Sequence, residues 1–326
     1  MAAAPTLRVR DLSVSFGRDG EVPAVRGVDL DVHRGQLVAL LGESGSGKSV
    51  TARAILGLSD ARVDAEQLRL GELDLTALSE AQRRGVRGSR ISLVFQDALS
   101  ALNPVLTIGD QLGELFRAHR GMSRRAARAR AVELLRTVGI PGPEQRVRGY
   151  PHQFSGGMRQ RILIAMAIAL EPDLLIADEP TTALDVTVQA QILDLLDRLR
   201  AERDMAVLLI THDLAVVSEV ADHIAVMYAG RIVETGRTED LLSHPAHPYT
   251  QALLRSVPRP DAAGGRLYAI PGTPPVPARR PPGCPFHPRC SWAVESCAST
   301  QPTMSIVGPG RQAACHRATE VLHAAG

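Results

Sequence analysis

Alternating hydrophobic and polar positions near the start of the chain predict β-strands. The alternation runs over Leu7–Phe16 and Val22–Val32, and an unbroken apolar run follows at Leu37–Leu41. Further short apolar runs predict strands at Ile91–Phe95, Leu174–Ala177, Ala206–Thr211 and His223–Tyr228. Helical spacing separates them and dominates residues 107–153. We therefore expect an α/β fold with a largely parallel sheet covered by helices, and an inserted helical subdomain at about residues 100–156.

The amino-acid composition changes near residue 245. Proline becomes dense between Pro258 and Pro288, and all four cysteines lie at or after Cys284. We therefore expect one domain over residues 1–245 and a small cysteine-rich module over residues 246–326.

Charge and hydropathy exclude some classes of protein. There are 37 basic and 35 acidic residues, so the whole chain carries no charge signature for nucleic acid. The longest apolar run, Ile162–Leu170, is nine residues, whereas a membrane-spanning helix needs roughly 20. Residues 1–13 lack an apolar signal core. The sequence predicts a cytoplasmic protein that reaches a membrane only through partners.

Lysine usage singles out one position. Of the 37 basic residues, only Lys48 is a lysine. A bias toward arginine that spares one site suggests that this site needs a compact ammonium group rather than a planar guanidinium.

That lysine lies in a phosphate-binding motif. Residues Gly42, Glu43, Ser44, Gly45, Ser46, Gly47, Lys48 and Ser49 fit the pattern G-x-x-x-x-G-K-[ST], between a predicted strand and a predicted helix. Backbone N–H groups of such a loop, with the following helix N-terminus, bind phosphate. Lys48 would contact the terminal phosphates, and the hydroxyl of Ser49 would bind Mg²⁺. The sequence predicts an ATP or GTP site.

Two acids end the predicted strand at Leu174–Ala177. Asp178 is placed to reach Mg²⁺ at the carboxyl edge of the sheet, and Glu179 is placed to polarise the attacking water.

Further motifs resemble those of the ABC ATPases, in the family's order. Phe154–Gln160 resembles the signature motif, whose usual form is L-S-G-G-Q, and Met158 stands where glutamine is usual. Gln96 resembles the Q-loop residue, Ala183–Asp185 the D-loop, and His212 the switch histidine. Phe16 lies where the family's adenine-stacking aromatic is expected. The resemblance implies a P-loop NTPase fold of ABC type with a mixed sheet core.

The resemblance also implies a mechanism. Two such domains would form a sandwich dimer around ATP, with Lys48, Ser49, Gln96, Asp178, Glu179 and His212 serving one nucleotide. Gln96 would join Ser49 and Asp178 at Mg²⁺. Ser155, Gly156 and Gly157 would face the γ-phosphate bound to the opposing subunit, with Asp185 nearby. ATP would close the dimer, and hydrolysis would reopen it.

The C-terminal part resembles one subfamily. His247–Leu254, Ala101–Pro104 and Gly283–Cys290 resemble segments of oligopeptide, dipeptide and nickel importer ATPases. This implies two membrane permease subunits, an extracytoplasmic peptide-binding protein, a paralogous ATPase as dimer mate, and a position at the cytoplasmic face of the membrane. Nickel import is the alternative within the subfamily.

The cysteines Cys284, Cys290, Cys297 and Cys315 leave three possibilities open. Disulfides are disfavoured in a reducing cytoplasm. Zinc accepts four cysteines but usually shows tight C-x2-C pairs, which are absent. The loose spacing suits a [4Fe–4S] cluster, and the resemblance to D-type peptide-importer ATPases favours it. His287 and His316 are close enough in sequence to replace a cysteine ligand.

Other function classes fit less well. DNA-repair ABC ATPases insert a long coiled coil between the phosphate loop and the signature motif, where this chain has about a hundred residues. Ribosomal members carry two ATPase domains in tandem. An inactive regulatory subunit would not need both Glu179 and His212. We expect an ATPase coupled to peptide import.

Overall fold

A computed structural model of the chain describes residues 4–17, 20–182, 184–257 and 268–324. The chain divides into two compact units. The first contains residues 4–6, Val32–Gln36 and Ala77–Leu209, and the second contains Leu7–Asp31, Leu37–Thr76 and the chain from Ile210 onward.

The first unit is mainly helical. Its strands β7 (Ile91–Val94) and β8 (Leu174–Asp178) pair in parallel, and β9 (Ala206–Thr211), which ends in the second unit, lies beside β8. Its helices are α2 (Glu80–Val86), α3 (Ala98–Ala101), α4 (Ile108–Arg120), α5 (Arg124–Thr137), α6 (Pro143–Arg146), the 3-10 turn η1 (Pro151–Gln153), α7 (Gly156–Ile168) and α8 (Val186–Arg203).

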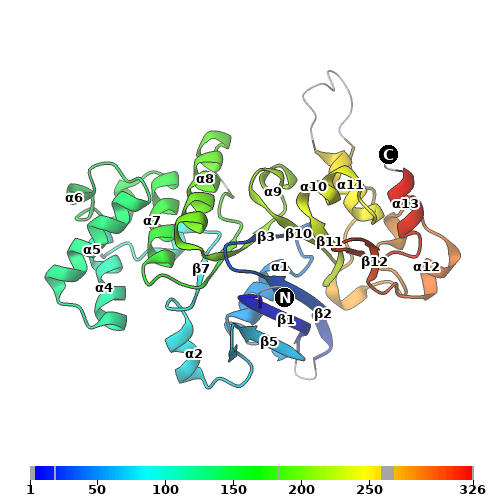
Figure 1. Cartoon of the computed structure of the whole chain (residues 1–326), viewed down its shortest axis with the longest axis horizontal. Helices are drawn as coiled ribbons and strands as arrows, with labels where there is room; N and C mark the ends of the chain where they lie inside the picture. The colour runs from blue at the N-terminus through cyan, green and yellow to red at the C-terminus, as the bar shows by residue number, and fades with distance from the viewer. Residues whose placement is uncertain (1–3, 18–19, 183, 258–267, 325–326) are drawn as a thin grey trace. The chain divides into compact units, whose positions relative to one another are not determined.

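Helices α4 to α7 lie side by side in the first unit (Figure 1). The bounds of the helical subdomain expected at about residues 100–156 stay a prediction. Hydroxyl caps define where its helices begin: Thr107 accepts a hydrogen bond from the N–H of Asp110 at the start of α4, and Ser123 does the same for Ala126 in α5. The buried residues Ala127, Ala131, Leu134 and Leu135 line one face of α5, as its 3.6-residue period requires.

The second unit holds an antiparallel sheet in the order β2-β1-β5-β6, with β4 also paired to β1. Its strands are β1 (Leu7–Phe16), β2 (Val22–Val32), β4 (Arg62–Asp64), β5 (Gln67–Leu70) and β6 (Leu73–Asp74). Buried Leu7, Val9, Leu12 and Val14 on β1 explain its sequence pattern, which skips one position at Asp11, where φ is +49°.

A further set of strands in the second unit runs β12-β13-β11-β10-β3. These are β3 (Leu37–Leu41), β10 (His223–Tyr228), β11 (Arg231–Arg237), β12 (Ser305–Gly308) and β13 (Arg311–Ala313). Its helices and 3-10 turns are α1 (Lys48–Ile55), α9 (Leu214–Val220), α10 (Thr238–Ser243), α11 (Pro248–Ser256), η2 (Pro277–Arg279), η3 (His287–Arg289), α12 (Glu295–Ser299) and α13 (Ala318–Ala324).

The expectation of a largely parallel sheet needs correction. Strand β3 pairs in parallel with β10, but β10–β11, β11–β13 and β12–β13 are antiparallel. The physical reason lies in the connections: only two residues, Ala229 and Gly230, join β10 to β11, and a link this short can only join antiparallel strands. The core is mixed, as the family resemblance implies.

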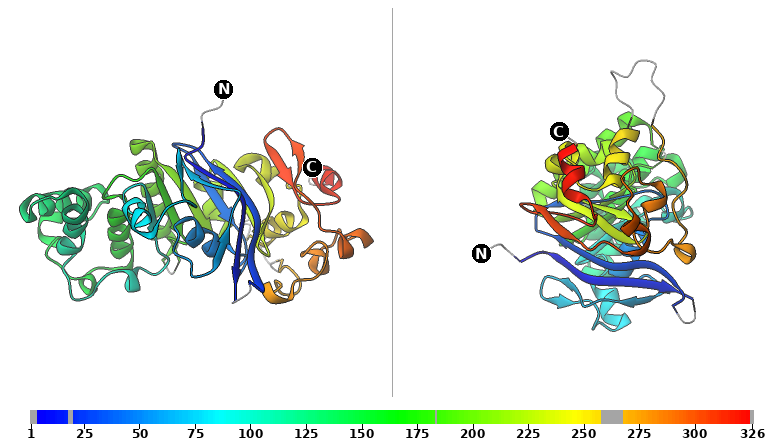
Figure 2. Two further views of the ribbon diagram at one scale, coloured as in Figure 1. Left: turned by 90° about the horizontal axis from the view of Figure 1, so that it is seen from below. Right: turned by 90° about the vertical axis from the view of Figure 1, so that its right-hand side faces the viewer.

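The C-terminal segment packs within the second unit. Strand β13 extends the sheet by pairing with β11, with Glu234 opposite Ala313. The β12–β13 hairpin and α13, coloured orange-red to red in Figure 2, form the C-terminal end of the described chain. Residues on both sides of position 245 belong to this unit. The domain boundary at 245 stays a prediction.

Candidate nucleotide-binding and catalytic residues

The predicted phosphate-binding loop joins β3 to α1, as its motif requires. Gly47 caps α1 with φ +109°, a backbone conformation that favours glycine. A side chain at Gly42 would lie 2.2 Å from the carbonyl oxygen of Met227, so only glycine fits there. The ammonium of Lys48 is buried and donates to the carbonyls of Gly42 (2.7 Å) and Glu43 (3.0 Å). The lone lysine therefore lies folded into the loop.

Glu43 of this loop is bonded to the C-terminal part of the chain. Its N–H donates to the hydroxyl of Tyr249 (2.9 Å), and its carboxylate accepts two hydrogen bonds from Arg289 (2.7 and 2.9 Å). Tyr249 and Arg289 lie in the C-terminal part of the chain, and sequence reasoning assigned neither of them to the site. The local signal was that Tyr249 lies in the His247–Leu254 segment and Arg289 in the Gly283–Cys290 segment of the subfamily resemblance.

The two acids at the end of β8 occupy different environments. Asp178 is buried, whereas Glu179 is half-buried and has φ +48°, in the left-handed region that a glutamate seldom adopts. One carboxylate oxygen of Glu179 accepts hydrogen bonds from the side chains of Gln96 (3.0 Å) and Thr182 (3.0 Å). The structure thus brings the predicted Q-loop residue and the predicted base together, and it adds Thr182, which sequence reasoning missed.

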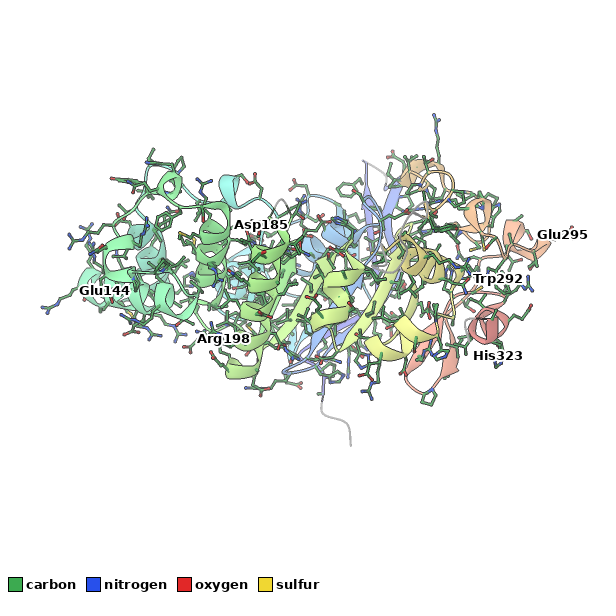
Figure 3. All side chains as sticks on the ribbon, turned by 90° about the horizontal axis from the view of Figure 1, so that it is seen from above. Glu144, Asp185, Arg198, Trp292, Glu295 and His323 are labelled. Carbon is green, nitrogen blue, oxygen red and sulfur yellow. The ribbon has the colours of Figure 1, made fainter. Side chains whose placement is uncertain are left out.

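Residues of the signature and D-loop segments begin helices. Ser155 is exposed and accepts a hydrogen bond from the N–H of Met158, so it caps α7. The following Gly156 is exposed and Gly157 is half-buried. Asp185 caps α8 through the N–H of Val188 (2.9 Å), and Figure 3 shows it at the start of that helix. Ala183 lies outside the described residues.

Two predicted nucleotide contacts lie at strand ends. Phe16 ends β1 and is 41% exposed, which leaves its ring accessible to a base. His212 follows β9 and is also exposed, next to Asp213, which caps α9 through the N–H of Ala215. The predicted ATP site draws Lys48, Ser49 and His212 from the second unit and Gln96, Asp178 and Glu179 from the first. That combined site stays a prediction.

The four cysteines are free thiols in the second unit. Burial, with a smaller contribution from the other cysteines, raises the pKa of Cys290 to about 11 and that of Cys315 to about 12. It raises the pKa of Cys284 as well. Within the described ranges, no three His, Cys, Asp or Glu side chains form a group that could hold a metal ion. His287 and His316 donate to the carbonyls of Cys284 and Thr300.

Comparisons with known proteins assign the chain to a family. Residues 25–182 match the ABC transporter family, and residues 233–297 match the oligopeptide/dipeptide transporter C-terminal region. The chain is 52% identical over 304 residues to the dipeptide transport ATP-binding protein DppD of Bacillus subtilis, covering 92% of this chain and 91% of the relative. It belongs to the ABC transporter family.

Another relative and a solved structure agree with this family. The DppD protein of Escherichia coli is 49% identical over 314 residues, which is 95% of this ABC protein and 96% of the relative. The dimeric, post-hydrolysis structure of the ATP-binding cassette MJ0796, bound to ADP and Pi, aligns with a TM-score of 0.64 at 28% identity, covering 71% of this chain and 98% of that one. The ABC fold that the sequence predicts is confirmed. Among the described residues, no helix has both the length and the apolar character needed to cross a bilayer.

Proposed function

We propose that this chain is the ATP-hydrolysing subunit that powers peptide import through a membrane ABC transporter. The relatives carry the name dipeptide transport ATP-binding protein and cover nine tenths of the chain or more. The match to the oligopeptide/dipeptide transporter C-terminal region supports a peptide importer rather than a DNA or ribosome ATPase. The observation that carries hydrolysis is the carboxylate of Glu179, oriented by Gln96 and Thr182 at the end of β8.

The chemistry assigned to these residues is attack of water on the terminal phosphorus of ATP. Glu179 accepts a proton from the water while the water oxygen bonds to the γ-phosphorus. The bond between that phosphorus and the oxygen bridging the β- and γ-phosphates breaks, which gives ADP and inorganic phosphate. The γ-phosphate would be bound by Lys48 and contacted by His212. The strained backbone at Glu179 fits this role, because residues in unfavourable conformations gather at functional sites.

The chain has side chains of the chemical type that binds a magnesium ion. Ser49, Gln96 and Asp178 offer a hydroxyl, an amide oxygen and a carboxylate, the hard oxygen donors that Mg²⁺ prefers. Bound Mg²⁺ would neutralise charge on the phosphates.

The partners follow from this function. We propose two permease subunits, an extracytoplasmic peptide-binding protein and a paralogous ATPase as dimer mate, with the chain at the cytoplasmic face of the membrane. Ser155 and Gly156 are exposed at the start of α7, as residues that reach a nucleotide on an opposing subunit must be.

Replacement of Glu179 tests the assigned base. Glu179→Gln keeps the shape of the side chain but cannot accept the proton, so ATP turnover by the assembled transporter should fall by about 100-fold or more. ATP binding should persist, and size-exclusion chromatography should show a closed dimer with the paralogous subunit. Turnover equal to wild type would refute the role of Glu179.

We also propose that Cys284, Cys290, Cys297 and Cys315 hold a [4Fe–4S] cluster. The support is the donor set: four free cysteines, half-buried or buried, lie in the same unit and offer the soft sulfur donors that such a cluster needs.

Anaerobic purification of the full chain tests the cluster. We expect a brown protein that contains iron and acid-labile sulfide, with a visible absorption band that Cys297→Ser abolishes. The exposed Ser296→Ala is the matched control and should keep the colour. A colourless anaerobic preparation with stoichiometric zinc would overturn the proposal.

A further inference from the structure

The phosphate-binding loop carries a carboxylate that is paired with a residue of the C-terminal extension, which is the chain from residue 246 onward. Arg289, in the turn η3, donates through both terminal nitrogens to the two carboxylate oxygens of Glu43, at 2.7 and 2.9 Å. The pair is 246 residues apart in sequence. Two parallel N–H···O bonds form a fork that fixes the orientation of both side chains.

Arg289 is held as firmly as the carboxylate that it binds. Its side chain is only 4% exposed, against 24% for that of Glu43. The remaining nitrogen donates to the carbonyl of Pro271 (2.8 Å), and a terminal nitrogen also reaches the hydroxyl of Tyr228 (3.3 Å). The guanidinium lies 5.8 Å from the ring centre of Tyr228 and 5.9 Å from that of Phe286. The strong pair with Glu43 raises the pKa of Arg289 further.

The aromatic residues around this pair connect the extension to the loop. The ring centres of Tyr228, Tyr249 and Phe286 lie 4.6 to 5.3 Å apart. Tyr249 accepts the N–H of Glu43, and the carbonyl of Glu43 accepts from Lys48. Three groups of one loop residue, its N–H, its carbonyl and its carboxylate, are therefore fixed, two of them by the C-terminal extension.

A bare carboxylate in this loop would oppose phosphate binding. Glu43 is five residues from Lys48 in a loop built to bind anions, and an unpaired negative charge there would repel ATP phosphates. Arg289 neutralises that charge from a nearly buried position, where solvent screens little.

We infer that the C-terminal extension is a part of the nucleotide site, and that Arg289 is a positioning residue for the phosphate-binding loop. It acts through Glu43, by neutralising its charge and fixing its direction, rather than by touching ATP. Nucleotide affinity therefore depends on a residue outside the ATP-binding motifs.

A double-mutant cycle on the full chain tests this inference, with a fluorescent ATP analogue and Mg²⁺ as the probe. Arg289→Met keeps the apolar stem over the aromatic rings but leaves Glu43 charged and unpaired, so Kd should rise by about tenfold or more. Glu43→Gln with Arg289→Met removes both charges and should return Kd to within about threefold of wild type. Arg279→Met, an exposed arginine of the same extension, is the control and should leave Kd unchanged.

The rescue separates this role from a merely structural one. If Arg289 only held the structure together, the double variant Arg289→Met with Glu43→Gln would lose as much nucleotide affinity as Arg289→Met or more. That result would overturn the inference. Wild-type affinity in Arg289→Met would overturn it too. If Arg289→Met does not fold, as thermal melting would show, Arg289→Lys takes its place. This variant keeps the positive charge but loses the pair of parallel hydrogen bonds to Glu43, so Kd for the ATP analogue should rise by less than about tenfold. Adding Glu43→Gln should then restore affinity less than it does in Arg289→Met.

Discussion

At the scale of single residues, His247 shows how the extension depends on an uncharged group. Its ring is 1% exposed and caps α11, with Nδ1 accepting from the N–H of Tyr249 (3.0 Å). Burial lowers its pKa from 6.5 to about 3, and a hydrogen bond with the backbone of Ala314 offsets this only in part. A proton on Nδ1 would remove the helix cap.

This arrangement predicts acid sensitivity. The folded pKa lies below the unfolded value, so below about pH 6.5 the unfolded chain binds a proton that the folded chain does not. The free energy of unfolding should fall by about 1.4 kcal/mol for each pH unit between that value and the folded pKa. His247→Asn keeps a capping oxygen but cannot titrate. Denaturant unfolding of this variant at a series of pH values should show a free energy of unfolding that falls less steeply with decreasing pH, by about 1.4 kcal/mol for each pH unit.

Exposed His323 provides the control for this experiment (Figure 3). His323→Asn should leave the slope unchanged, because that side chain meets water in both states. Identical slopes for wild type and His247→Asn would contradict the buried, neutral histidine.

Residues differ in how far the sequence predicts them. Lys48 and Glu179 lie in local motifs, so their roles can be predicted from neighbours alone. The partners of Glu43 cannot, since Arg289 meets it only through the folding of the whole second unit. Thr182 lies three residues from Glu179, and its bond to that carboxylate accompanies a left-handed backbone at Glu179, which the sequence does not indicate.

At the scale of elements, the start of α7 distinguishes two adjacent glycines. A Cβ at Gly157 would lie 2.6 Å from a methyl of Val188 in α8, whereas one at Gly156 would meet Leu184 at an ordinary 3.6 Å. The signature segment thus needs a small residue at its second glycine for helix packing as well as for any phosphate contact.

Thermal and denaturant unfolding of two alanine variants tests this difference. Gly157→Ala should lower the free energy of unfolding by about 1–3 kcal/mol, because overpacking forces α7 and α8 apart. Gly156→Ala is its matched neighbour and should change stability by less than about 1 kcal/mol. Equal stability of the two variants would show that Val188 moves aside freely.

Strands were predicted well where they are buried and long. The ranges predicted for Leu7–Phe16, Val22–Val32 and His223–Tyr228 agree with β1, β2 and β10. The short strands β4, β5, β6, β12 and β13 were not predicted, because they are short and largely exposed or polar, and distant pairing decides their structure. The equally short β7 was predicted because its residues are mostly apolar and buried. Strand β11 was missed as well, since its polar residues break the alternation.

At the scale of the whole molecule, the extension is continuous with the ATP-binding fold in packing. Buried Glu234 on β11 accepts the N–H groups of Ala246 and His247 (2.7 and 3.0 Å), and β13 completes the edge of β11. The change in amino-acid composition near residue 245 lies within the second unit. Composition reports local chemistry, whereas unit boundaries follow from long-range contacts.

Lys48 gives the molecule a property that most proteins lack. Because it is the chain's single lysine, an amine-selective reagent has only this side chain and the N-terminal amine to react with. The ammonium is buried against the carbonyls of its own loop, so its labelling rate reports directly on opening of that loop. The native sequence is thus already a single-lysine probe for chemical footprinting, with no other lysine to remove.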